Sequence, residues 1–188
     1  MPVMNDANTA LLVIDVQDSF KLGANWSQRS SPRFEESIST LIRDFRESGR
    51  PIFFILHTDN DPGFRRGDAA LKLMDFVDFR AGDPLLYKTT RNSFTSTDLQ
   101  SRLDALGVRR VVITGIQTEQ CCETTARVAA DLGYEVDFVT EATMTFPIAH
   151  DGDVLSTDEI IRRTEFVLRN RFARIVKTEE ITGALSAT

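Results

Sequence analysis

The 188-residue chain has few of the residues that disulfide-stabilised and metal-binding proteins rely on: two cysteines, two histidines and one tryptophan. The two cysteines, Cys121 and Cys122, are adjacent, so they cannot build a framework of crossing disulfides. Such cysteine usage is typical of a reducing compartment, and we expect a cytoplasmic protein. Residues 1–6 lack the basic start and apolar stretch of a signal peptide, which agrees with this expectation.

Long apolar runs and an excess of basic residues are also missing. No stretch approaches the ~20 apolar residues that span a bilayer. Acidic residues outnumber basic ones, 28 to 22, and no basic stripe is present. We therefore expect neither nucleic acid nor an anionic membrane surface as a partner. The length fits one domain over residues 1–188, with an ordinary globular composition.

The chain does contain a regular alternation of short apolar runs and amphipathic stretches, which is typical of repeated βα units on a parallel sheet. The runs are solidly apolar, as expected for strands that are covered on both faces. We predict strands at 10–14, 52–56, 85–87, 111–113, 136–139 and 175–176.

Helices are predicted between these strands. They cover 34–46, a segment from a capping box at 97–100 to residue 106, a segment from Cys121 to 132, and a segment from Thr157 to 168 that carries Phe166 on its apolar face. Two regions, 21–32 and 59–82, break the alternation, and the second leaves room for one short helix near 69–74. Long inserts in a tight βα fold are often lids or rims of a site, and we expect that role here.

Cys121 is the first residue with evident chemistry, because it follows a predicted strand and a turn at Gly115 where a helix is expected to begin. The positive end of a helix favours a thiolate, the nucleophilic form of cysteine. Unpaired N–H groups of the same turn could receive an oxyanion. The plainer alternative is a small buried cysteine that only packs beneath the sheet.

Asp15 and Lys88 end two other predicted strands. In parallel α/β sheets ligands bind beyond the carboxyl ends of the strands, so Asp15 is expected in that crevice. Each residue has a plainer interpretation, Asp15 as a turn or capping residue and Lys88 as a solvated edge residue. Three reactive groups at three strand ends favour one shared site.

A thiol needs a base to take its proton, and a carboxylate of raised pKa in a dry cleft can serve. A lysine ammonium beside it stabilises both the carboxylate and the nascent thiolate. Histidine is the more common base, and His57 ends the second predicted strand, so a Cys121–His57 pair remains an alternative. An enzyme that forms an aspartyl-phosphate would need a second aspartate two residues after Asp15, where Gln17 stands.

Three segments, 13–20 (VIDVQDSF), 88–94 (KTTRNSF) and 114–127 (TGIQTEQCCETTAR), closely resemble the isochorismatase-like cysteine hydrolases. The resemblance runs from about residue 10 to the predicted strand at 175–176. It implies a three-layer α-β-α fold whose six-stranded parallel sheet has the Rossmann-like order 3-2-1-4-5-6. It also implies a homo-oligomer, either a dimer or a tetramer.

The resemblance also implies a role for each residue of a catalytic triad. Cys121 would be the nucleophile, Asp15 the general base and acid, and Lys88 their electrostatic partner. A cis peptide bond would join Ile116 to Gln117. An oxyanion hole would be formed by the backbone N–H groups of Gln117 and Cys121.

Departures from the family pattern narrow the range of possible substrates. Relatives that hydrolyse nicotinamide carry an Asp-x-His and a further histidine for a metal, whereas segment 57–64 (HTDNDPGF) has one histidine, so we expect no metal and no other cofactor. Members that act on isochorismate cleave a vinyl ether and lack the cysteine, so Cys121 argues against that reaction. Cys122 replaces a usually apolar residue and is expected to pack in the core, with a vicinal redox disulfide as the alternative.

These observations predict a metal-free cysteine amidohydrolase that acts on a small amide or carbamoyl compound. Cys121 would attack the carbonyl, ammonia or an amine would leave with a proton from Asp15, and water would resolve the thioester. The alternative is a catalytically silent α/β binding or scaffolding protein that retains the site. Candidates for lining the substrate pocket, each of which could also be a packing residue, are Gln17, Phe20, Trp26, His57 and Phe94.

Overall fold

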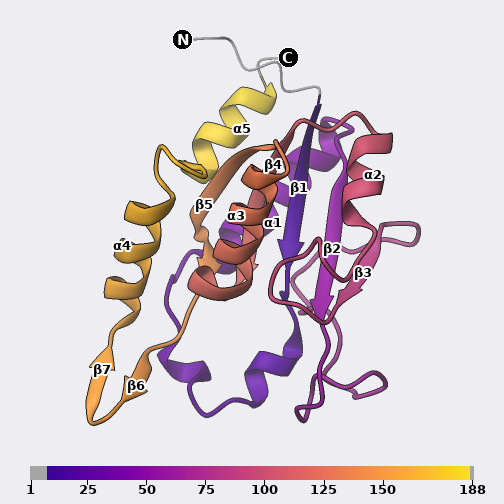
Figure 1. Cartoon of the computed structure of the whole chain (residues 1–188). Coiled ribbons are helices and arrows are strands. Elements are labelled where there is room, and N and C mark those ends of the chain that lie inside the picture. The colour runs from indigo at the N-terminus through magenta and orange to yellow at the C-terminus, as the bar shows by residue number, and fades with distance from the viewer. Residues whose placement is uncertain (1–7, 187–188) are drawn as a thin grey trace.

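A computed structural model describes residues 8–186, so the expectation drawn from residues 1–6 lies outside the described part. Its centre is a six-stranded parallel sheet with the order β3-β2-β1-β4-β5-β8 (Figure 1). Because β8 is the sixth strand of this sheet, the predicted order 3-2-1-4-5-6 is confirmed. The strands cover Thr9–Ile14 (β1), Ile52–His57 (β2), Leu85–Lys88 (β3), Arg110–Ile116 (β4), Glu135–Met144 (β5) and Arg174–Ile175 (β8).

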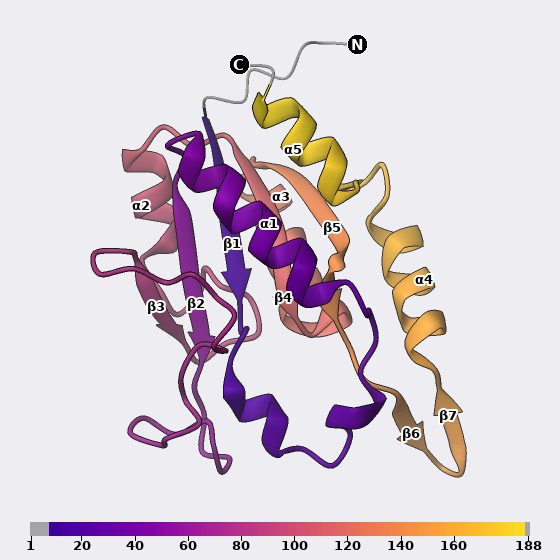
Figure 2. The same ribbon diagram turned by 180° about the vertical axis from the view of Figure 1, so that it is seen from behind.

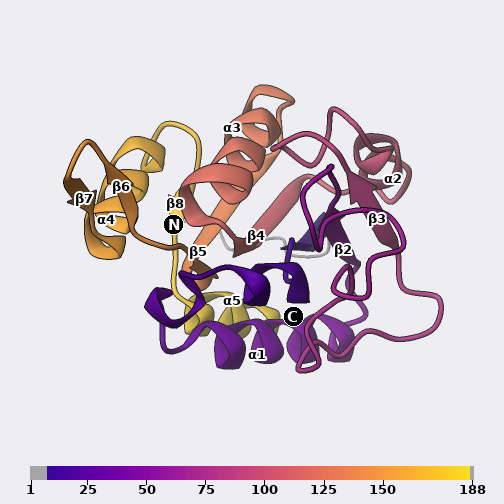
Figure 3. The same cartoon turned by 90° about the horizontal axis from the view of Figure 1, so that it is seen from below.

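Helices cover both faces of the sheet, which explains why the central strands are largely apolar (Figures 2 and 3). Alternate residues of β1 enter two separate cores: Leu12 lies in one and Leu11 in the other. The first core includes residues of α2 (Leu99–Ala105), α3 (Glu123–Asp131) and α4 (Thr157–Leu168). The second includes residues of α1 (Phe34–Glu47) and α5 (Thr178–Ser186). The sheet and the helices on its two faces thus form the predicted three layers.

Gly115 lets β1 and β4 approach closely just before the site. Its φ is +128°, and a Cβ at this position would lie 1.8 Å from the carbonyl oxygen of Ile14. Any side chain would therefore push the two central strands apart, and the glycine is required by both its conformation and its surroundings.

Several helix details differ from the predictions. The capping box at 97–100 does not form; instead the Thr97 hydroxyl accepts from the N–H of Leu99 at 3.1 Å. Helix α4 is capped by Ser156 rather than Thr157, in a capping box with Glu159. Phe166 is 71% exposed, so it does not belong to the buried face of that helix.

The insert at 59–82 contains no helix or strand, so the short helix near 69–74 is wrong. One bridge, between Gln17 and Leu73, ties the insert to the end of β1. Region 21–32 holds the end of the short 3-10 helix η2 (Asp18–Leu22) and all of η3 (Trp26–Gln28). Between residues 8 and 186 we find no helix that is long and apolar enough to cross a membrane.

A β-hairpin that the sequence analysis missed connects β5 to α4. Its strands are β6 (Ile148–His150) and β7 (Asp153–Leu155), joined by Asp151 and Gly152 with φ of 50° and 84°. Two successive positive φ angles are what a two-residue type I′ turn requires, and Asp-Gly is a preferred sequence for it.

Candidate active site

Asp15 lies directly after β1, at the edge of the sheet where the parallel strands end. Its backbone is left-handed, with φ of 54°, a conformation that aspartate tolerates better than most residues. The Asp15 N–H donates to the carbonyl of Ile55 at 2.8 Å, which fixes the residue against β2. The side chain is completely buried.

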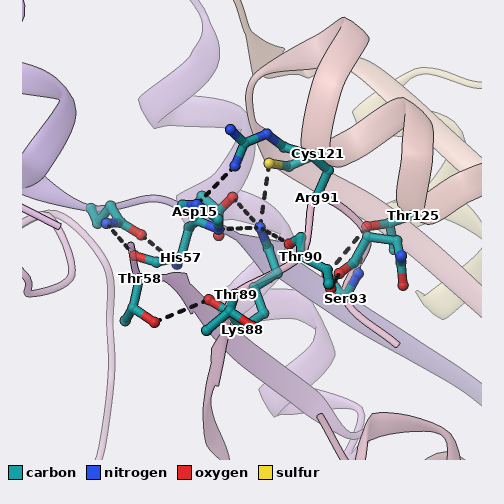
Figure 4. Close-up of polar contacts among 12 residues, drawn as sticks. Asp15, His57, Thr58, Lys88, Thr89, Thr90, Arg91, Ser93, Cys121 and Thr125 are labelled. Carbon is teal, nitrogen blue, oxygen red and sulfur yellow. Dashed lines mark hydrogen bonds and ion pairs between the residues drawn. The ribbon is translucent and has the colours of Figure 1, made fainter. Parts of the chain in front are cut away.

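Lys88 is the last residue of β3, and it is also completely buried rather than solvated. Its Nζ lies 2.8 Å from Asp15 Oδ2 and donates to Cys121 Sγ at 3.3 Å and to the carbonyl of Thr90 at 3.2 Å (Figure 4). The ammonium therefore connects the carboxylate to the thiol. The structure brings the three residues predicted at three strand ends into one cluster.

Cys121 lies in η4 (Thr118–Cys122), a π-helical turn between β4 and α3. The Gln117 carbonyl closes this turn by accepting from the N–H groups of Gln120 at 3.2 Å and Cys122 at 3.1 Å. The prediction that Cys121 opens the α-helix was therefore slightly wrong, because α3 begins at Glu123. A cis peptide bond joins Ile116 to Gln117, as the resemblance implied.

Burial governs the electrostatics of the cluster. It raises the pKa of the Asp15 carboxyl, and the Lys88 ammonium offsets only part of that effect. Burial, followed by the negative charge of Asp15, raises the pKa of the Cys121 thiol to about 12. The Cys121 thiol therefore needs a neighbouring base to give up its proton. Asp15 shares the contact with Lys88 Nζ and is the carboxylate of this cluster that can take the thiol proton.

His57 ends β2 and contacts the cluster through Lys88. Its Nδ1 lies 3.3 Å from Lys88 Nζ, while its Nε2 lies 2.8 Å from Arg91 Nη1 and 3.1 Å from Asp59 Oδ2. Burial and then the charge of Lys88 lower the pKa of the His57 imidazole. Between residues 8 and 186 no hydrogen bond joins His57 to the thiol of Cys121, because Lys88 Nζ contacts both of them.

Gln17 uses its side chain to join the ends of β1 and β2. Its Nε2 donates to the His57 carbonyl at 3.1 Å and to Ser19 Oγ at 2.9 Å, and its Oε1 accepts from the His57 N–H at 2.8 Å. The amide is completely buried and is already bonded at both ends. This placement suits a structural clamp better than the predicted contact with substrate.

A cavity of about 510 Å³ is lined in part by Gln117, the residue that precedes η4, but not by Asp15, Lys88 or Cys121. Phe20 and Trp26, two of the predicted substrate-binding residues, are among its lining residues, whereas His57 is not. Phe64 connects the two regions, since it lines the cavity and its ring lies 6.2 Å from that of His57. The wall is mainly apolar and is formed by Phe20, Leu22, Trp26, Pro62, Phe64, Phe146, Pro147 and Ile148, together with Ser19, Gly23, Ala24, Asn25 and Gln117.

Phe94 and Cys122 lie in the core beneath the sheet edge. The Phe94 ring stacks on Tyr134 with ring centroids 5.9 Å apart, and Phe94 is not among the lining residues of the cavity at Gln117. Cys122 is completely buried and its thiol is free, in the packing position that was expected for it.

Three residues of this region were missed from the sequence. Phe64 belongs to the insert at 59–82, and its position in a predicted rim was a usable signal. Phe146 follows β5, which extends to Met144, five residues beyond the predicted end at 139. Arg91 stood inside a quoted motif, but nothing in the sequence indicated that its guanidinium reaches His57.

Over the described residues, no group of three or more histidine, cysteine, aspartate or glutamate side chains is arranged to hold a metal ion. His57 and Asp59 form a pair without a third ligand.

The fold has three layers, and its parallel sheet brings an aspartate, a lysine and a cysteine together at its carboxyl edge. This is the architecture of the isochorismatase-like α/β hydrolases. The family model "Isochorismatase domain" matches residues 9–179, and the chain belongs to this family.

Individual relatives agree with this assignment. Nicotinamidase 3 from Arabidopsis thaliana is 32% identical, covering 96% of this chain and 90% of its own length. The isochorismatase family protein YrdC from Bacillus subtilis is 29% identical, covering 92% of this chain and 93% of its own length. A solved structure of an isochorismatase-family protein from Chromobacterium violaceum superimposes with a TM-score of 0.92 at 27% identity, and the match covers 100% of both chains.

Proposed function

We propose that the chain is a metal-independent cysteine hydrolase that cleaves the C–N bond of a small amide or carbamoyl compound through a thioester. The observation that carries this proposal is the position of Lys88 Nζ, 2.8 Å from Asp15 Oδ2 and 3.3 Å from Cys121 Sγ. A nucleophile, its base and a cation that stabilises both are the groups that such a reaction needs. The name of the Arabidopsis relative, a nicotinamidase, supports an amide as the substrate class.

The first half of the reaction forms the thioester. Asp15 takes the thiol proton as Cys121 Sγ attacks the carbonyl carbon, and the C=O electron pair moves to the oxygen. The N–H groups of Gln117 and Cys121 stabilise this oxyanion. When the C–N bond breaks, Asp15 returns the proton to the leaving nitrogen, and ammonia or an amine departs.

The second half regenerates the enzyme. Asp15 removes a proton from a water molecule, whose oxygen attacks the thioester carbonyl, and the C–S bond breaks. The acid product leaves and Cys121 recovers its proton from Asp15. Burial suits Asp15 to both tasks, because a raised pKa makes its carboxylate a better proton acceptor than an ordinary aspartate.

The cavity supports a substrate with an apolar body. Phe20 and Trp26 line it together with Phe64 and Phe146, and Gln117 connects it to the proposed oxyanion hole. Aromatic walls with few polar groups bind the body of a ligand, while the polar edge fixes its orientation. Within this proposal Phe20 and Trp26 keep the substrate-binding role, and His57 shapes the polar side through its contact with Lys88.

A screen of small amides and ureido acids for ammonia release tests the proposal, with Cys121→Ala as the blank. We expect release by the native chain only, and mass spectrometry of quenched reactions should find the acyl group on the peptide that contains Cys121. An acyl group on Cys122, or equal release by the blank, would contradict the nucleophile assignment. Saturable binding of these compounds without any release would support the catalytically silent binding protein instead.

A further inference from the structure

Arg91 brings a second cation to the mouth of the site. It lies three residues after Lys88, in the segment between β3 and α2, and its guanidinium Nη1 is 2.8 Å from His57 Nε2. Figure 4 shows this side chain reaching back over the cluster that contains Cys121 and Lys88. Arg91 is an exposed residue, so its guanidinium can meet a ligand that arrives from solvent.

The backbone on both sides of Arg91 is held in place. On one side the Thr90 carbonyl accepts from Lys88 Nζ at 3.2 Å. On the other side the Asn92 side chain accepts from the N–H groups of Phe94 at 2.9 Å and Thr95 at 2.8 Å. The position of the Cα atom is thus fixed next to the reacting groups, while the long side chain can still turn.

His57 is a poor partner for this guanidinium. A neutral imidazole has one lone pair, and here two cations face it, Lys88 at Nδ1 and Arg91 at Nε2. Asp59 Oδ2, 3.1 Å from Nε2, competes as well, because it requires an N–H on the same nitrogen. The contact between Arg91 and His57 therefore satisfies neither group fully.

No carboxylate within residues 8–186 lies at ion-pair distance from Arg91, whereas the charge of Lys88 is matched by that of Asp15. A guanidinium has five N–H donors in a planar fork that fits a carboxylate bidentately. If Arg91 turned to such a ligand, His57 Nε2 would be free to donate to Asp59. Both groups would then have suitable partners.

We propose that Arg91 determines specificity by binding a carboxylate of the substrate, so that the enzyme acts on amides or carbamoyl compounds that carry an anionic group. This inference rests on the proposed function, because it places the anion within reach of Cys121. The apolar body of such a substrate would extend into the cavity beyond Gln117.

Two alkylating reagents of nearly equal size provide a test without knowledge of the natural substrate. Iodoacetate carries a carboxylate and iodoacetamide carries a neutral amide, and each forms a C–S bond to Cys121 with loss of iodide. The ratio of the two rate constants at one pH cancels any difference in thiol reactivity between variants. We expect Arg91→Gln to lower the iodoacetate-to-iodoacetamide ratio at least roughly tenfold, because a charged hydrogen-bonded pair is lost.

Arg102→Gln is the matched control, since it removes one positive charge from the surface of α2, where Arg102 pairs with Asp98. The ratio should not change in this control. Arg91→Lys keeps the positive charge but loses the planar fork of N–H donors. Its iodoacetate-to-iodoacetamide ratio should lie between that of the native chain and that of Arg91→Gln. It also serves as the test variant if Arg91→Gln is unstable.

An unchanged ratio in Arg91→Gln, or an equal fall in Arg102→Gln, would overturn the inference about Arg91 and leave the proposed function intact. Alkylation of Cys121 by neither reagent would be a different result, because it would overturn the proposed function and this inference with it.

Discussion

Lys88 Nζ lies 2.8 Å from Asp15 Oδ2, and both side chains are completely buried. Two charges taken out of water in this way stabilise each other only as a pair, because either one alone would carry a large desolvation penalty. The same pair sets the chemistry of the site, since burial raises the pKa of Asp15 while Lys88 opposes that effect. Stability and the proposed catalysis therefore depend on the same contact.

Lys88→Met should be strongly destabilising for this reason. The change leaves the Asp15 carboxylate buried without a cation, and the loss of one partner of a buried pair typically costs about 3–5 kcal/mol of unfolding free energy. Urea unfolding of the single variants and of the Asp15→Asn/Lys88→Met double variant measures the coupling. The double variant should lose less unfolding free energy than the two single variants lose together. Losses that simply add would contradict a coupled pair.

Much of the fold could be predicted because the local pattern agrees with the global structure. Solidly apolar runs marked all six parallel strands, and the residues at their ends, Asp15, Lys88 and Cys121, converge because parallel strands end at one edge. The sequence pattern could not show how far a strand extends beyond its apolar run, so Phe146 was missed as a neighbour of the site.

The errors have physical causes of their own. Helix α5 was not predicted, because it contains Gly183 and has weak local signals; packing of Ile181 and Leu185 holds it in the core it shares with α1. Phe94 was a candidate for the pocket wall or for packing, and its ring stacks on Tyr134 in the core. The oligomeric state depends on surfaces that a single chain does not reveal, and the dimer or tetramer stays a prediction.

Gly115→Ala should destabilise the chain more than Gly133→Ala. Both glycines have positive φ, +128° and +93°, but a Cβ meets the Ile14 carbonyl only at Gly115, and nothing lies within 4 Å at Gly133. We expect about 1–2 kcal/mol for the conformation alone at Gly133 and at least roughly twice that at Gly115. Chemical denaturation of both variants gives the comparison, and equal losses would mean that the two strands can move apart without cost.

The pH dependence of stability should report on His57. Burial and Lys88 lower the pKa of His57 in the folded chain below its ordinary 6.5, so the folded state binds fewer protons than the unfolded state. The resulting stability is present above pH 6.5 and is lost as the pH falls toward the folded pKa, with a slope of at most about 1.4 kcal/mol per pH unit.

His57→Asn should therefore flatten the decline of unfolding free energy below pH 6.5. His150→Asn is the matched control, because the other histidine of the chain has an exposed side chain in the β6–β7 hairpin. A decline that persists in His57→Asn and disappears in His150→Asn would show that the burial of His57 had been misjudged.

Activity on any amide found in the screen should survive exhaustive chelation. Segment 57–64 supplies a single histidine, and borderline transition metals favour imidazole or thiolate ligands. The measurement is turnover before and after dialysis against a chelator. Turnover that is lost and then restored by zinc, iron or manganese would show that His57 and Asp59 hold a metal after all.

Asp15→Asn distinguishes the two candidate bases. An asparagine keeps the shape of the side chain but cannot take the thiol proton, and a positioned general base is typically worth 10²–10⁴-fold in rate. We expect kcat to fall by roughly that factor, measured well below the melting temperature because the change also weakens the pair with Lys88.

His57→Asn should raise KM more than it lowers kcat, as expected for a group that affects the bound substrate and the transition state alike. The physical reason is that the negative charge of Asp15 acts directly on the Cys121 thiol, whereas His57 contacts the cluster only through Lys88. A nearly normal kcat in Asp15→Asn together with an inactive His57→Asn would transfer the role of base to His57.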